Sequence, residues 1–169
     1  MSQALRHPTR IGATLPSSKG LAKSIAHHTS KLMARYPGAA LVEAGAGTGS
    51  LSAGLLHHSP LLVEPNAEFA AKLRGSFPDI NVTESCITQV LGQADHTIVL
   101  VMSIPLLCHP LKREIKASVK DAYTRGKLAG CVTYSYGYRN PYKGLPFVSR
   151  QCADFICMNL PPASVWIHE

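Results

Sequence analysis

The 169-residue chain is 46% hydrophobic and 16% charged, and it carries a formal net charge of +7. Its length suffices for one domain with its own core, and its apolar content excludes a disordered chain. The longest apolar run, residues 97–108, is interrupted by Ser103 and Pro105 and is too short to cross a bilayer. The basic balance favours an anionic partner, which is nucleic acid, an acidic membrane face or an anionic cofactor.

The cysteine content favours a reducing compartment. The five cysteines are an odd number without a CxxC pair. They are Cys86, Cys108, Cys131, Cys152 and Cys157. The first residues show no apolar core of the kind found in secretory signals. We therefore expect a cytoplasmic protein in which residues 1–169 form a single domain.

The N-terminal region, residues 1–37, contains a predicted amphipathic helix. The Pro-Ser-Ser segment at 16–18 is typical of a helix start, and Pro37 should end the helix near Arg35. The apolar positions at helical spacing are Leu21, Ile25, Leu32 and Met33, and the basic positions on the opposite face are Lys19, Lys23, Lys31 and Arg35. Two roles stay open: a helix that closes over a cofactor, and a peripheral helix on anionic lipid headgroups.

In the remaining core region, 38–169, strand patterns alternate with helical ones. The predicted strands are 40–43, 61–63, 80–83, 97–102, 131–138, 148–158 and 163–167. The predicted helices are 50–57, 67–77 and 112–127. This alternation predicts a parallel α/β sheet. No helical pattern separates the last two strands, so we expect them to form an antiparallel hairpin at one edge of the sheet.

The sharpest chemical signal is the Glu-Ala-Gly-Ala-Gly-Thr-Gly segment at residues 43–49, where the first predicted strand meets a helix. In open α/β sheets the ligand crevice opens at the carboxyl ends of such strands, and glycines let a ligand approach the backbone. Glu64 ends the next predicted strand. An acid at that position can accept hydrogen bonds from ribose hydroxyls.

Two alternatives to a nucleoside site are a packing turn and a dinucleotide site. A glycine-rich turn can serve packing alone, but the acid at the second strand argues for a ligand. A dinucleotide is disfavoured because Ser50 stands where the third glycine of G-x-G-x-x-G belongs, and no phosphate-binding G-x-x-x-x-G-K-[ST] segment is present. The Glu43 carboxylate under the turn would also repel a pyrophosphate, whereas it suits a cationic ligand.

The pattern E-x-G-x-G-x-G, followed by an acid at the next strand tip, resembles the Rossmann-like S-adenosylmethionine-dependent methyltransferases. The resemblance implies a seven-stranded, mostly parallel sheet with an antiparallel C-terminal hairpin and helices on both faces. It implies S-adenosylmethionine as cofactor, bound by Glu43, Gly45, Gly47, Gly49, Glu64, Cys86 and Ile87. Cys86 stands where the family often carries an adenine-binding acid, for which Glu84 is a possible substitute. A cofactor-binding protein without catalysis is therefore the rival interpretation.

Four further segments resemble bacterial phospholipid N-methyltransferases, which methylate phosphatidylethanolamine toward phosphatidylcholine. They are residues 12–22, 103–106, 132–134 and 159–166. The resemblance implies a lipid substrate and a peripheral location on the inner face of the membrane. The same group is similar to rRNA adenine N6-dimethyltransferases. Leu106 replaces the aromatic residue that stacks on the target base in those enzymes. A phospholipid amine is the favoured acceptor, and an rRNA adenine or a small molecule is the alternative.

Candidate catalytic residues follow the central strand and lie on the next one. Tyr134, Tyr136 and Tyr138 alternate, which predicts that they share one face of a strand. One or two of these tyrosines, with Ser103 and Pro105, are predicted to line the acceptor amine, because aromatic faces bind a quaternary ammonium well. Tyr134, Ser103 and Pro105 are the candidates of choice, and packing of the tyrosines under helices is the alternative.

The histidines give weaker signals. His109 follows the central strand, where it is a base or, more simply, a surface residue. The pairs at 27–28 and 57–58 raise the question of a metal, but adjacent residues on a helix point in different directions. No cysteine or carboxylate stands at ligand spacing beside them, so no metal site is predicted.

Overall fold

The computed structural model describes residues 18–169. Its strands are β1 (Ala40–Ala44), β2 (Leu61–Val63), β3 (Val82–Thr83), β4 (Ile98–Met102), β5 (Leu128–Tyr136), β6 (Arg150–Ile156) and β7 (Ala163–His168). Its α-helices are α1 (Lys19–Arg35), α2 (Ala67–Ser76), α3 (Ile87–Gln93) and α4 (Lys112–Thr124). Its 3-10 turns are η2 (Ser52–Gly54), η3 (Leu56–His58) and η4 (Leu106–Cys108). The predictions for residues 1–17, including the first part of the 12–22 segment, lie outside the described residues.

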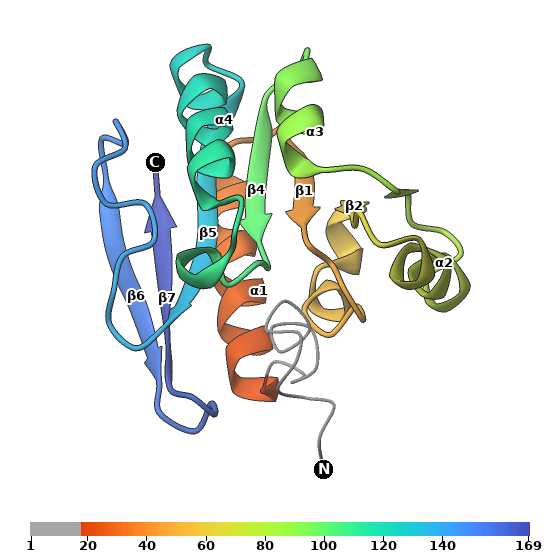
Figure 1. Ribbon diagram of the computed structural model, residues 1–169, viewed down its shortest axis with the longest axis horizontal. Helices are drawn as coiled ribbons and strands as arrows, with labels where there is room; N and C mark the ends of the chain where they lie inside the picture. The colour runs from red at the N-terminus through yellow and green to blue at the C-terminus, as the bar shows by residue number, and fades with distance from the viewer. Residues whose placement is uncertain (1–17) are drawn as a thin grey trace.

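Within residues 18–169 seven strands form one sheet in the order β3-β2-β1-β4-β5-β7-β6. Strands β1 to β5 are parallel to one another, whereas β7 is antiparallel to both β5 and β6. Figure 1 shows α1 on one side of the sheet and α3 and α4 on the other. The predicted fold class is confirmed, including the antiparallel C-terminal hairpin.

The core occupies both faces of the sheet. All five residues of β4 are buried, as its continuous apolar run predicts. On one face Val99 and Val101 belong to the same core as the apolar side of α1. On the other face Leu100 shares a core with Ile115 and Val119 of α4. The strand that carries Ser103 at its end is therefore held from both sides.

Helix α1 is amphipathic, as predicted, and its apolar side is fully used by the core. The Ser18 side chain caps the helix by accepting a hydrogen bond from Leu21 N at 3.2 Å. Leu21, Ile25 and Leu32 are each at most 1% exposed. A helix that lies flat on a membrane must place its apolar face among the lipids. Since this face packs on the sheet, it is closed to lipids, and a contact of α1 with headgroups would have to use its exposed basic face.

The segment predicted as a helix at 50–57 is instead two consecutive 3-10 turns, η2 and η3. Gly54 packs tightly beneath α1, because a Cβ added there would lie 3.1 Å from the Ala26 Cβ. Glycine also favours helices poorly. Because Gly54 packs closely against α1 and has a low helix propensity, 3-10 turns form here in place of the expected α-helix.

Helix α3 was not predicted from the sequence. It has only seven residues, one of which is Gly92. Its N-cap is Cys86 rather than the Ser, Thr, Asp or Asn that usually marks a helix start. The other element boundaries differ from the predicted ones by a few residues.

The prediction that three alternating tyrosines share one face is wrong for Tyr138. Gly137 follows the end of β5 with φ +72°, a turn that breaks the alternation. Tyr134 pairs with Val165, so the next residue, Trp166, points to the opposite face of the sheet. The Tyr138 ring contacts Trp166 with centroids 5.8 Å apart. Tyr138 therefore lies across the sheet from Tyr134.

Candidate functional site

The glycine turn joins β1 to η2 at the carboxyl end of β1. The register of β1 with β2 and with β4 brings the ends of these strands to one edge of the sheet (Figure 1). Gly45 N donates to Val63 O at 2.8 Å, which ties the turn to the end of β2. Gly45, Gly47 and Gly49 have φ angles of +72°, +54° and +81°. Residues with a Cβ rarely adopt such angles, so this turn requires glycine.

Two of these glycines also lie too close to other side chains to carry a Cβ. A Cβ on Gly45 would be 2.3 Å from Ile104 Cγ1, and a Cβ on Gly49 would be 2.7 Å from Phe77 Cε2. Ile104 thus packs directly on the backbone of the turn. The turn is fixed in place from the β4 side and from the α2 side.

Gly45→Ala is expected to lower the free energy of unfolding by about 2 kcal/mol, because the new methyl is strained and meets Ile104. Adding Ile104→Ala should restore part of the loss by removing the contacted atom. Gly75→Ala is the matched control, since an added Cβ in α2 has no neighbour within 4 Å. Chemical unfolding measures all four proteins. A Gly45→Ala protein as stable as the Gly75→Ala control would contradict this account of the turn.

Glu64 directly follows β2 and is 7% exposed. Its Oε2 accepts a hydrogen bond from Gly47 N at 2.9 Å, and its Oε1 accepts one from Asn66 N at 2.9 Å. The carboxylate therefore joins the glycine turn to the loop after β2. Each carboxylate oxygen has a second lone pair, so Glu64 can hold these backbone donors and still accept from a ligand hydroxyl.

Glu43 is fully buried beneath the turn, with 0% exposure. Its Oε1 accepts a hydrogen bond from Ser103 Oγ at 2.7 Å, whereas its Oε2 has no hydrogen-bond partner within residues 18–169. Burial raises the pKa of this carboxyl to about 7, against the opposing effect of the Ser52 and Ser103 hydroxyls. A buried carboxylate with an unpaired oxygen is stabilised by a nearby cationic group.

Tyr134 and Ser103 continue this contact across the sheet. The Tyr134 hydroxyl donates to Ser103 O at 3.2 Å, and Ser103 N donates to Ala44 O at 2.9 Å. Tyr134, Ser103 and Glu43 thus form one chain of contacts from β5 past the end of β4 to β1. Residues predicted separately for the acceptor side and the cofactor side lie together here.

Pro105 lines a cavity of about 290 Å³ at the carboxyl ends of β4 and β5. The other lining residues are Leu107, Cys108, Ser135, Tyr136 and Arg139. The wall is largely apolar, with a guanidinium and a phenol among its polar groups. A few polar groups in an apolar wall are typical of small-ligand sites. Sequence reasoning missed Arg139 because a loop turn, and no local pattern, brings it beside Pro105.

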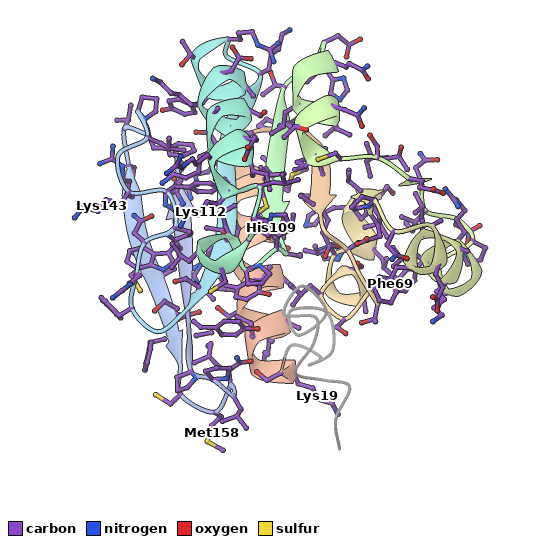
Figure 2. The ribbon with its side chains drawn as sticks, viewed as in Figure 1. Lys19, Phe69, His109, Lys112, Lys143 and Met158 are labelled. Carbon is purple, nitrogen blue, oxygen red and sulfur yellow. The ribbon has the colours of Figure 1, made fainter. Side chains whose placement is uncertain are left out.

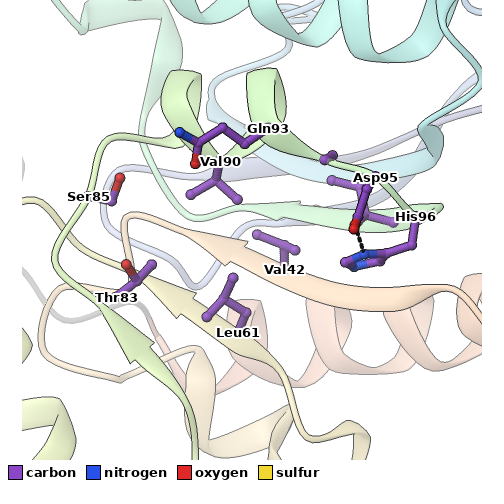
Figure 3. Close-up of a pocket in the computed structure, with 10 residues that line it drawn as sticks. Val42, Leu61, Thr83, Ser85, Val90, Gln93, Asp95 and His96 are labelled. Carbon is purple, nitrogen blue, oxygen red and sulfur yellow. Dashed lines mark hydrogen bonds and ion pairs between the residues drawn. The ribbon is translucent and has the colours of Figure 1, made fainter.

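A second hollow, of about 360 Å³, lies between α3 and the strands β1, β2 and β3 (Figure 3). Val42, Leu61 and Val90 are among its apolar lining, and Asp95 and His96 are among its polar lining. It is larger than the cavity at Pro105. However, its lining includes neither Glu43 nor Glu64 and no residue of the glycine turn, so we place the candidate site at the turn.

Cys86 and Ile87 lie at the start of α3. Cys86 N donates to Gln89 Oε1 at 3.3 Å, and Thr88 Oγ1 donates to Cys86 Sγ at 3.2 Å. Ile87 is 2% exposed and belongs to the core beneath α3 and α4. Ile87 therefore packs in the core. Cys86 before it is half-buried, and Glu84 is exposed.

The histidines lie apart from the Glu43–Ser103–Tyr134 contacts. His109 Nδ1 accepts a hydrogen bond from Leu111 N at 3.2 Å, and burial lowers the pKa of this imidazole. His57 and His58 both contact the Ser30 hydroxyl, at 3.3 and 2.9 Å. Within the described chain, 18–169, no group of three His, Cys, Asp or Glu side chains could hold a metal ion.

Comparisons with known proteins inform the fold only. No family model matches the chain, and no curated protein matches it. Similar solved structures include PH1948 of Pyrococcus horikoshii, assigned provisionally as an RNA methyltransferase, with a TM-score of 0.68 and 13% identity over 97% of this chain and 90% of that one. The 23S rRNA methyltransferase ErmE has a TM-score of 0.62 and 16% identity over 87% and 67% of the two chains.

The bifunctional kinase-methyltransferase WbdD is similar as well, with a TM-score of 0.69 and 11% identity. That likeness covers 98% of this chain but only 42% of WbdD. At such low identities the likeness establishes the fold alone. The three structures share the Rossmann-like methyltransferase fold.

Proposed function

We propose that this chain is an S-adenosylmethionine-dependent N-methyltransferase that acts on the amine of a phospholipid headgroup. The observation that carries the proposal is the contact chain Glu43–Ser103–Tyr134. It joins a glycine turn of the kind that binds a nucleoside to the strand beside the Pro105 cavity. A cofactor and an acceptor bound on its two sides would meet at the end of β4.

The residues of the turn fit this cofactor. Gly47 leaves the backbone of the turn open to close approach, since a Cβ added there would meet nothing nearer than Gly45 O at 3.9 Å, and Glu64 is positioned to accept from ribose hydroxyls. The unpaired Oε2 of Glu43 favours a cationic group. When bound, S-adenosylmethionine supplies a methyl group on a positively charged sulfur, so the protein needs chiefly to orient the acceptor.

On the acceptor side, the amine must be neutral to attack. A desolvated pocket disfavours the ammonium form, and the largely apolar cavity at Pro105 offers such a pocket. The Tyr134 hydroxyl donates to Ser103 O at 3.2 Å, which fixes the phenol beside the loop that carries Pro105. Tyr136, which lines this cavity, also offers an aromatic ring to a methylated ammonium.

Tyr134→Phe is expected to lower kcat about tenfold without weakening cofactor binding, because it removes one hydrogen bond on the acceptor side. Tyr123→Phe is the matched control. It also removes a phenol hydroxyl that makes one hydrogen bond, an exposed one from Val148 N at 3.3 Å, near the C-terminal end of α4. Transfer of a labelled methyl group to phosphatidylethanolamine vesicles gives kcat, and calorimetry gives cofactor affinity. Equal kcat values for the two variants would show that the Tyr134 hydroxyl plays no part in the reaction of the acceptor.

The choice of a lipid acceptor rests on the resemblance to phospholipid N-methyltransferases and on Leu106. This side chain is 1% exposed and belongs to the core, so it does not face an acceptor, and it offers no aromatic ring for a base. The fold likeness to ErmE favours an rRNA adenine as the second candidate. A lipid acceptor places the protein peripherally on the inner membrane face. Within residues 18–169 no helix is long and apolar enough to span a bilayer.

Incubation with methyl-labelled S-adenosylmethionine tests both candidates. One reaction contains phosphatidylethanolamine vesicles, and the other contains ribosomal subunits. Label in the lipid extract supports the phospholipid acceptor. Label in RNA alone contradicts it and supports the rRNA adenine instead. If calorimetry detects no binding of S-adenosylmethionine, both candidate functions are contradicted.

A further inference from the structure

The turn between β6 and β7 exposes two large apolar side chains. Met158 is 92% exposed and Leu160 is 83% exposed. Between them Asn159 is only 5% exposed: its Oδ1 accepts from Ser18 N at 3.2 Å, and its Nδ2 donates to Pro161 O at 2.6 Å. The buried amide thus ties the turn to the start of α1. Met158 and Leu160 project from a fixed turn rather than from a loose loop.

This turn lies at the same end of the molecule as the candidate site. Strands β1 and β4 point toward that end, and the β6–β7 turn and the start of α1 reach it as well (Figure 1). Figure 2 shows Met158 and Lys19 together there. An equally exposed apolar residue, Val148 at 91%, precedes β6 at the opposite end, beside the C-terminal Glu169.

The charges around the turn are positive. Residues 155–163 and 18–30 contain no acidic residue, while Lys19 and Lys23 are exposed. The nearest acid in sequence, Asp154, accepts hydrogen bonds from Ser24 and His28. Farther along α1, Arg35 is paired with Glu169 at 2.7 Å. Lys19 and Lys23 have no ion pair with any residue from 18 to 169, so the basic charge at the start of α1 is available beside the exposed apolar turn.

We infer that the β6–β7 turn enters an anionic lipid surface, with Met158 and Leu160 among the lipids and Lys19 and Lys23 on the headgroups. This deepens the proposed function and rests on it for the choice of lipid. Since the apolar side of α1 is used by the core, the inserted apolar groups must come from elsewhere, and this turn supplies them. The protein would stand end-on, with the end of β4 facing the membrane.

Cosedimentation with vesicles tests the inference. One set contains phosphatidylcholine alone, and the other contains phosphatidylcholine mixed with phosphatidylglycerol. Met158→Ser with Leu160→Ser is expected to weaken binding to the mixed vesicles about tenfold or more, while the control Val148→Ser leaves it unchanged. Lys19→Gln with Lys23→Gln should weaken binding about fivefold per lysine on mixed vesicles only, and added salt should reduce wild-type binding.

Three outcomes would overturn the inference. They are a wild-type protein that binds neither vesicle, a turn variant that binds like wild type, and a turn that mediates self-association. Light scattering without lipid detects the last as a dimer that Met158→Ser with Leu160→Ser dissociates. Calorimetry with S-adenosylmethionine on the same proteins separates the two proposals. If the turn variants no longer bind vesicles but still bind S-adenosylmethionine, both the membrane surface and the proposed function are supported. If the wild-type protein binds vesicles but not S-adenosylmethionine, the membrane surface is supported and the proposed methyltransferase function is contradicted.

Discussion

Replacing Glu43 with glutamine is expected to stabilise the unliganded protein by about 3 kcal/mol above about pH 7. Burial raises the pKa of this carboxyl from 4.5 to about 7, so the folded protein holds the proton more tightly than the unfolded chain does. Wild-type stability should therefore fall as the pH rises from 4.5 to about 7, and level off above it. Glutamine carries no charge and avoids that loss.

Chemical unfolding at a series of pH values measures this effect. The exposed Glu84→Gln is the matched control, because it removes a carboxylate that is not buried. If wild type and Glu43→Gln lose stability in parallel between pH 4.5 and 7, the buried carboxylate is not the cause. The same variant should bind S-adenosylmethionine about tenfold more weakly, because it removes the anionic partner of a cationic ligand. In this protein a stabilising substitution would therefore impair the proposed function.

Glu64→Ala is expected to weaken S-adenosylmethionine binding about 100-fold and to lower the free energy of unfolding by about 3 kcal/mol. The substitution removes the acceptor for a ribose and leaves Gly47 N and Asn66 N without their partner. Calorimetry measures the affinity, and chemical unfolding measures the stability. Glu68→Ala in α2 is the control, since its ion pair with Lys72 is exposed and contributes little. A Glu64→Ala protein that keeps cofactor affinity would show that the ligand does not contact this carboxylate.

Much of the fold was predictable because local patterns agree with the tertiary structure. The apolar run that became β4 is buried on both faces, and the Glu43–Gly49 segment forms the turn that its glycines require. Glu64 lies next to that turn, as the spacing of acid and strand predicts. The antiparallel end of the sheet followed from the missing helical pattern between the last two strands.

The failures have tertiary or single-residue causes. Packing of Gly54 against α1 turns an expected helix into 3-10 turns, and Gly137 moves Tyr138 to the other face of the sheet. Helix α3 is too short, and its cap too unusual, for a periodic pattern to reveal it. The contact between Tyr134 and Ser103 joins residues 31 positions apart, so the sequence could nominate both residues but not their contact.

The contact between Ile104 and Gly45 has a thermodynamic consequence. Ile104 stands between Ser103, which binds Glu43, and Pro105, which lines the cavity, and its side chain rests on the backbone of the glycine turn. Neither loop can shift without displacing the other. A displacement of either loop by a ligand would reach the other loop, and by linkage any resulting change in affinity would be equal in both directions. Such a displacement would make the saturation curve of one ligand depend on the concentration of the other.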